Sequence, residues 1–62
     1  MDYEYEQCLG DGLYAAFDGY QIILAANSRV GDSPTDTVAL EPRVVSNFIL
    51  YVESLRKKGV NI

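Results

Sequence analysis

The sequence contains no histidine and no tryptophan, and its 62 residues include one cysteine, Cys8. Without an imidazole, the chain cannot assemble a Ser-His-Asp or Cys-His catalytic centre. A single cysteine forms no disulfide within the chain, and with no histidine beside it a structural zinc site is excluded as well. We therefore expect no enzyme activity, no catalytic residues, no metal and no cofactor.

Basic residues and long apolar runs are also scarce. Five lysines and arginines stand against nine acids, which gives a net charge of −4. Proteins that bind duplex DNA need a basic face to neutralise phosphates, so we expect no duplex DNA partner. No apolar run approaches about 18 residues and the N-terminus is acidic, so we expect neither a membrane span nor a signal peptide. The expected location is the cytoplasm.

What the chain does contain is a globular composition at a marginal length. Apolar residues make up 48% of it, and five tyrosines and two phenylalanines are among them. A domain of about 60 residues buries only about 60% of the surface that its unfolded chain exposes. Because disulfides and metals are excluded as supports, we expect one domain over residues 1–62 that associates with itself, most simply as a dimer.

The segment from Leu9 to Leu24 predicts a β-hairpin. Asp18-Gly19 lies between two apolar stretches, and Asp-Gly is among the strongest signals for a two-residue turn. Such a turn pairs Phe17 with Tyr20 and sorts the strands into two faces. The first face, the expected core, carries Leu13, Ala15, Phe17, Tyr20, Ile22 and Leu24. The second face, which is too apolar for a comfortable solvent surface, carries Tyr14, Ala16, Gln21, Ile23 and Ala25.

A third strand over residues 36–40 and a helix over residues 42–58 complete the predicted fold. Pro42 suits the first helical position, and Gly59 suits the cap after the last turn. At helical spacing, one stripe of the helix carries Val44, Val45, Phe48, Val52 and Leu55. We expect an α+β fold in the order βββα: a three-stranded antiparallel meander over residues 8–40, with one C-terminal helix packed on one sheet face. Residues 1–7 alternate acids with tyrosines, as either a frayed arm or an added N-terminal edge strand.

Because the helix can cover only one face, the second face is expected to bind a partner or another copy. The candidate contact residues come from this face, the N-terminal segment and the opposite side of the helix: Tyr3, Tyr5, Tyr14, Ala16, Gln21, Ile23, Ala25 and Leu50. The candidate anion contacts, if two chains bring them together, are Arg29, Arg43, Arg56 and Lys57. Cys8 is expected to be a small buried residue, and turn geometry accounts for Asp11 and Asp18.

The charges are unevenly placed along the chain. The first twenty residues carry five acids and no base, whereas residues 53–62 carry three bases and one acid. Opposite charges at the two ends favour association, either within the chain or between copies.

The string LGDGLYAAFDGYQI from Leu9 to Ile22, followed by Leu40-Glu41-Pro42 before a helix, resembles a family of small phage- and prophage-encoded proteins. These proteins share the pattern YLGDGVYAxFDGYxI … LEPxV, and here Cys8 stands where a tyrosine is common. The resemblance spans residues 8–55. It implies a phage accessory protein made inside a bacterium, and it supplies no catalytic residues.

Three functions are consistent with these features. The first is a non-catalytic, homo-oligomeric module that inhibits a bacterial host or immune-defence protein by direct binding. The second is an oligomeric nucleotide-binding protein that sequesters a signal through the basic residues named above. The third is a structural subunit of a phage assembly. The expected partners are therefore a second copy of the chain and a bacterial protein.

Overall fold

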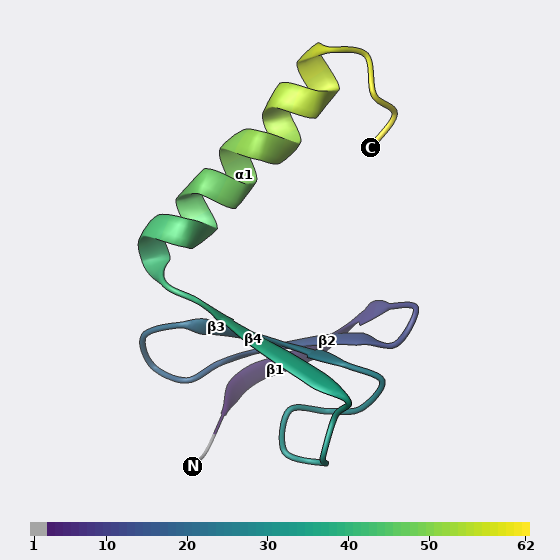
Figure 1. The fold of residues 1–62 in the computed structure, drawn as a ribbon. Coiled ribbons are helices and arrows are strands. Elements are labelled where there is room, and N and C mark those ends of the chain that lie inside the picture. The colour runs from purple at the N-terminus through teal and green to yellow at the C-terminus, as the bar shows by residue number, and fades with distance from the viewer. Residues whose placement is uncertain (1–2) are drawn as a thin grey trace.

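The computed structural model describes residues 3–62, which form one sheet and one helix. The elements are β1 (Glu4–Gly10), β2 (Leu13–Phe17), β3 (Ile22–Ala26), β4 (Asp36–Leu40) and α1 (Pro42–Lys57). The strands pair antiparallel in the order β1-β2-β3-β4 (Figure 1). The predicted α+β class and the meander are confirmed. The N-terminal segment supplies an added edge strand, β1, while its residues 1 and 2 lie outside the described residues.

The β2–β3 hairpin turns one residue later than predicted. Its centre is Gly19-Tyr20, and the Asp18 N–H donates to the Gln21 carbonyl over 3.1 Å. Phe17 consequently pairs with Ile22, so the predicted pair of Phe17 with Tyr20 is wrong. Asp18 explains the difference, because its carboxylate oxygen accepts the N–H groups of Tyr20 at 2.9 Å and Gln21 at 2.6 Å. An aspartate before a turn commonly makes these bonds.

Moving the turn by one residue shifts the strand pairing by two residues, since Phe17 pairs with Ile22 instead of Tyr20. The same strand side chains therefore stay on each face of the sheet, because the side-chain period of a strand is two. We call the side on which α1 lies the helix-side face, which carries Leu9, Leu13, Ala15, Phe17, Ile22, Leu24, Val38 and Leu40. We call the opposite side the far face, which carries Cys8, Tyr14, Ala16, Ile23, Ala25, Thr37 and Ala39.

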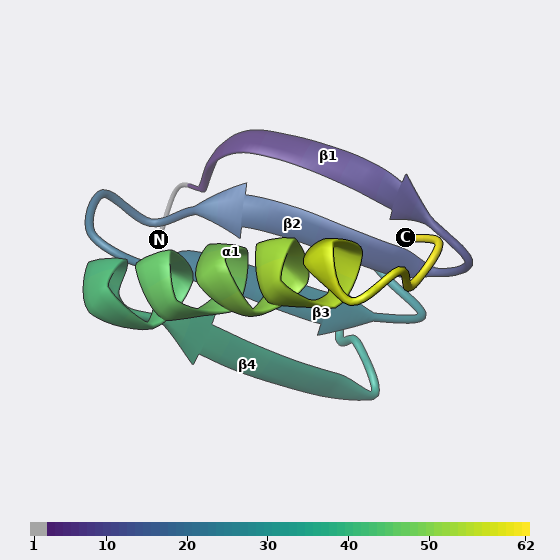
Figure 2. The same cartoon turned by 90° about the horizontal axis from the view of Figure 1, so that it is seen from above.

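Helix α1 does not cover the helix-side face, which corrects the predicted helix-on-sheet contact. In projection the helix runs back above β2 and β3 (Figure 2), but Figure 1 shows that it rises away from the sheet along its length. No residue of α1 is buried, and Phe48, in the middle of the apolar stripe, is 54% exposed. The ends of the helix match the prediction closely, with Pro42 at its start and Gly59, at φ 90°, after Lys58 at its end.

The junction between β4 and α1 explains this direction. Glu41 is the one residue between them, and it is extended at φ −65° and ψ 159°. Proline disfavours the helical region for the residue before it, and its own φ is fixed near −65°. The Glu41 carbonyl already accepts the Val45 N–H at 2.9 Å, so the helical ladder begins at once. The chain therefore has very few backbone torsions with which to lower α1 onto the sheet.

The most buried side chains lie on the far face, not on the predicted core face. Among residues 3–62, the buried apolar side chains are Ala16, 4% exposed, and Ala25, 1% exposed. Each alanine sits in a central strand directly opposite a larger neighbour, Ile23 or Tyr14. The loop between β3 and β4 lies on the same side of the sheet (Figure 1) and is tied to β1 by the Val30 N–H, which donates to the Glu6 carboxylate at 3.0 Å.

Gly12 is the glycine whose conformation the fold most clearly requires. It follows β1 at φ +79°, and its carbonyl accepts the Asn27 N–H at 2.7 Å. A Cβ at Gly12 would lie 3.2 Å from the Asn27 side-chain oxygen. We predict that Gly12→Ala lowers the free energy of unfolding by about 1–2 kcal/mol, because alanine is strained at positive φ.

Gly31→Ala is the matched control for that substitution, since nothing lies within 4 Å of the Cβ that it would add. It should change the stability by less than about 0.5 kcal/mol. Urea denaturation of both variants at one chain concentration measures the difference. Equal destabilisation by the two substitutions would contradict the role given to Gly12.

The Asp18 turn predicts a dependence of stability on pH. Hydrogen bonds from the Gln21 and then the Tyr20 backbone lower the pKa of Asp18 from its ordinary value of 3.8. A depressed folded-state pKa means that the unfolded chain binds the proton more readily, so this contribution is present above about pH 4 and disappears as the pH falls through the folded-state pKa. We expect wild type to be more stable than Asp18→Asn at pH 6, with the gap closing towards pH 2. Thermal unfolding monitored by circular dichroism tests this, and a gap independent of pH would refute it.

Candidate contact surface

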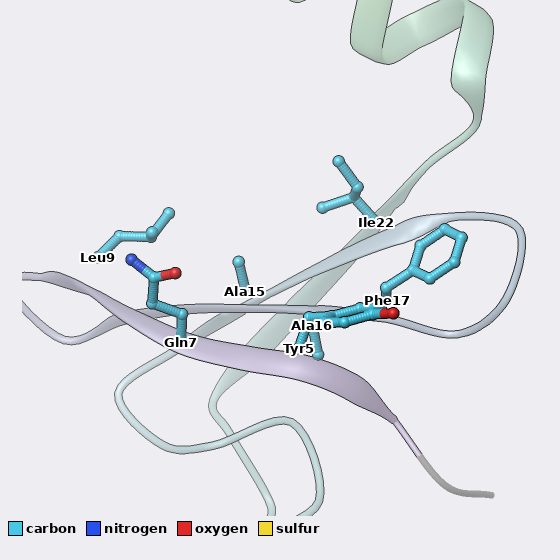
Figure 3. Close-up of a pocket in the computed structure, with 7 residues that line it drawn as sticks. All are labelled: Tyr5, Gln7, Leu9, Ala15, Ala16, Phe17 and Ile22. Atoms are coloured by element: carbon cyan, nitrogen blue, oxygen red, sulfur yellow. The ribbon is translucent and has the colours of Figure 1, made fainter.

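Two apolar surfaces of the chain are open to solvent. One is the helix-side face, none of whose side chains is buried and where Val38 is 52% exposed. The other is the helix stripe, which we define as Val44, Val45, Phe48, Val52 and Leu55. Figure 3 shows Leu9, Ala15, Phe17 and Ile22 projecting from the sheet towards the side of α1, while Ala16 projects the other way. Helix α1 diverges from the sheet along its length (Figure 1), and Phe48 in the helix stripe is 54% exposed.

A shallow hollow of about 280 Å³ lies at the end of the helix-side face formed by β1, β2 and the start of β3. Its walls are mostly apolar, and they include the rings of Tyr5 and Phe17, whose centroids lie 6.5 Å apart at a tilt of 40°. Tyr5 reaches Phe17 from an irregular stretch of β1, where its φ of 57° accompanies a shift in register between Glu4 and Gln7. A bulge of this kind re-aims a side chain, and here it adds an aromatic ring to the rim of the face.

A second hollow of about 170 Å³ lies on the same face, between Leu13, Leu24 and Val38. Both hollows are open and lined by carbon, with few polar groups to orient a substrate. Binding sites for small molecules are usually concave and contain several convergent polar groups. The helix-side face therefore has the character of a contact area for another apolar surface.

The third hollow, of about 120 Å³, lies on the far face and is polar. It lies between Glu6, Cys8, Tyr14 and Arg29. Cys8 is exposed there as a free thiol, so the prediction that it is buried is wrong. It lies in an edge strand, where Tyr14 is its single cross-strand neighbour. Among residues 3–62, no three His, Cys, Asp or Glu side chains group to hold a metal ion.

The structure does not bring the eight predicted contact residues together. Tyr14, Ala16, Ile23 and Ala25 do share the far face, but the two alanines are buried and not available to a partner. The remaining four are dispersed over the N-terminal segment, the hairpin turn and the side of α1 opposite the helix stripe: Tyr3, Tyr5, Gln21 and Leu50. Tyr5, 82% exposed, lies beside the helix-side face, and Leu50, 62% exposed, points away from the helix stripe.

The predicted anion contacts are also separated within one chain. Arg43 lies in the first turn of α1 and Arg56 and Lys57 in its last turn, which the helical rise places about 20 Å apart. The Arg56 side chain donates to the Ile62 carbonyl at 2.7 Å. Arg29 is in the loop on the far face. No anion pocket is formed by these four residues in a single copy.

Sequence reasoning did not anticipate that the helix-side face is open to solvent, although it recognised the residues as apolar. Alternation identified them correctly but assigned them to a core covered by the helix. The signal that could have corrected this is Glu41-Pro42, a junction with little freedom placed directly between strand and helix.

Comparison with known proteins yields no match to a protein family, to a curated protein or to a solved structure. Within residues 3–62, α1 is too short and too polar to cross a membrane. The surface itself is therefore what indicates a function.

The exposed thiol gives a direct check on the far face. We predict that Cys8 reacts with Ellman's reagent in the folded protein at nearly the rate measured in urea, because β1 is an exposed edge strand. Cys8→Ser should abolish the signal and leave the circular dichroism spectrum unchanged. Protection of the thiol by more than about tenfold would show that something covers this side of the sheet.

Proposed function

We propose that this protein is a non-catalytic binding module that contacts another protein through the helix-side face and the helix stripe. The observation that carries the proposal is the exposure of both surfaces, with Phe48 54% and Val38 52% open to solvent. Soluble monomers rarely expose large contiguous apolar patches, and those that do usually bind a partner there. Aromatic side chains at the centre of such a patch are typical anchors of protein interfaces.

The two surfaces support contact with a protein more than with a small ligand. They come from different elements, and the hollows on the helix-side face are shallow and contain few polar groups. Tyr5, beside the helix-side face, and Tyr51, next to the helix stripe in α1, are both exposed. Tyrosine offers a large contact area together with a hydroxyl that tolerates water, which suits the edge of an interface.

We further propose that the module is a phage accessory protein that inhibits a bacterial host or immune-defence protein by direct binding. The resemblance over residues 8–55 supports this origin. The absence of histidine argues against catalysis by the common nucleophilic mechanisms. The acids of β1, Glu4 and Glu6, favour encounter with a basic partner. A role as a structural subunit would use the same surface, whereas the separation of the basic residues gives no support to nucleotide binding.

Photo-crosslinking tests the contact surface. We predict that benzoylphenylalanine in place of Phe48 gives a discrete protein adduct in a bacterial lysate, because position 48 lies at the centre of the helix stripe. The same group in place of Leu50, which lies on the opposite side of α1 and is somewhat more exposed than Phe48, should give little adduct.

Competition makes this experiment specific. An excess of unlabelled wild-type chain should suppress the adduct from position 48, whereas an excess of the double variant Val38→Lys/Phe48→Asp, altered on both surfaces, should not. The proposal fails if position 48 gives no adduct with any protein, or if positions 48 and 50 label the same proteins equally.

A further inference from the structure

We propose that the occupant of this surface is a second copy of the chain. In a symmetric dimer, α1 of each copy lays its helix stripe on the helix-side face of the other copy. This assignment rests on the function proposed above, since it names the partner of the same surface. The far face stays free in such a dimer, and it would remain available to a bacterial protein.

The surface area of the chain is the first argument for a second copy. A folded monomer of 6.9 kDa is expected to expose about 4000 Å². This chain exposes 4881 Å², which is about 900 Å² more than that expectation. A standard stable interface buries about 800 Å² on each partner. The excess therefore matches what one copy contributes to a dimer of ordinary size.

The dimensions of the chain agree with its area. A compact domain of this length has a radius of gyration of about 10.6 Å, whereas this chain measures 12.9 Å and extends over 39 × 24 × 17 Å. The difference arises because α1 leaves the sheet instead of lying on it (Figure 1). One open helix and one open sheet face per copy also match in number. Two copies related by a twofold axis can cover all four surfaces with no remainder.

The junction at Glu41 favours exchange, meaning a dimer in which each helix lies on the sheet of the other copy, over closure, meaning a monomer whose helix lies on its own sheet. Closure would have to come from the few backbone torsions of this junction, which Pro42 restricts. A second copy can lie on both surfaces without any change at this residue. A short hinge loop that keeps an element from packing on its own chain promotes domain swapping, in which identical chains exchange that element.

Charge gives an independent argument for association of like chains. From residue 3 to residue 28 every charged side chain is acidic, which places only negative charge on β1 and on the turns around β2. The end of α1 carries Arg56, Lys57 and Lys58. Like chains would repel if their charge were uniform, but here the basic helix end of one copy can approach the acidic strands of the other.

Sedimentation equilibrium gives the first test. The wild-type chain should sediment with twice the mass of 6.9 kDa. Phe48→Asp, in the helix stripe, and Val38→Lys, on the helix-side face, should each weaken the dimer about thirtyfold or more. Both positions are more than half exposed in one copy, so neither substitution disturbs a buried site. Leu50→Asp is the matched control and should leave the dimer intact.

Mixing the two variants distinguishes exchange from every other dimer. A mixed pair contains one intact contact, between the unchanged helix of Val38→Lys and the unchanged sheet of Phe48→Asp. Its second contact sets the new aspartate against the new lysine. Two monomeric variants should therefore form a dimer when mixed, which pairing through the edge of β4 cannot produce.

Three results would overturn the exchange. They are a monomeric wild type at hundreds of micromolar, a dimer that survives both substitutions, and a mixture that stays monomeric although circular dichroism shows α1 in each variant. A monomeric wild type whose position 48 still crosslinks to a different protein would refute the exchange and leave the proposed binding function standing. No adduct of any kind would refute both.

Discussion

The direction of helix α1 is set by Glu41, the one residue between the last strand and the helix. Its extended conformation follows from Pro42, which also supplies the first residue of the helix. The same proline thus starts the helix efficiently and restricts where it can point. The openness of the helix-side face depends on this restriction, because α1 is the element of residues 3–62 that could cover the sheet.

The two faces of the sheet differ in how much apolar area they bury without cover from the helix. On the far face, Ala16 and Ala25 lie opposite Ile23 and Tyr14. The loop between β3 and β4 lies on the same side of the sheet, so these small side chains are buried without the helix. On the helix-side face most side chains are larger, and every one is half-buried or exposed. Burial of apolar area contributes about 25 cal/mol per Å², and most of the area still available for it lies on this second face and on α1.

Sequence patterns predicted local structure well and contacts between elements poorly. Alternation placed Leu13, Phe17 and Leu24 on one face, and that assignment survived a register error because the shift was even. The turn was misplaced since the pattern Asp18-Gly19 favours a two-residue loop, whereas the Asp18 carboxylate caps the turn that follows it. The helix-side face was expected to be a covered core but is open, because hydrophobicity shows which residues avoid water but not what covers them.

The small number of buried side chains has a consequence for the lifetime of the protein inside a cell. Among residues 3–62 the buried apolar side chains are Ala16 and Ala25, so a single copy would resist unfolding weakly and the proposed dimer would resist it better. Binding to the folded state raises stability in proportion to the logarithm of the partner's concentration, and in a dimer that partner is the chain itself. Chains too dilute to pair would be degraded first, since proteases act on transiently opened states. The surviving amount of this protein would thus rise more steeply than its rate of synthesis.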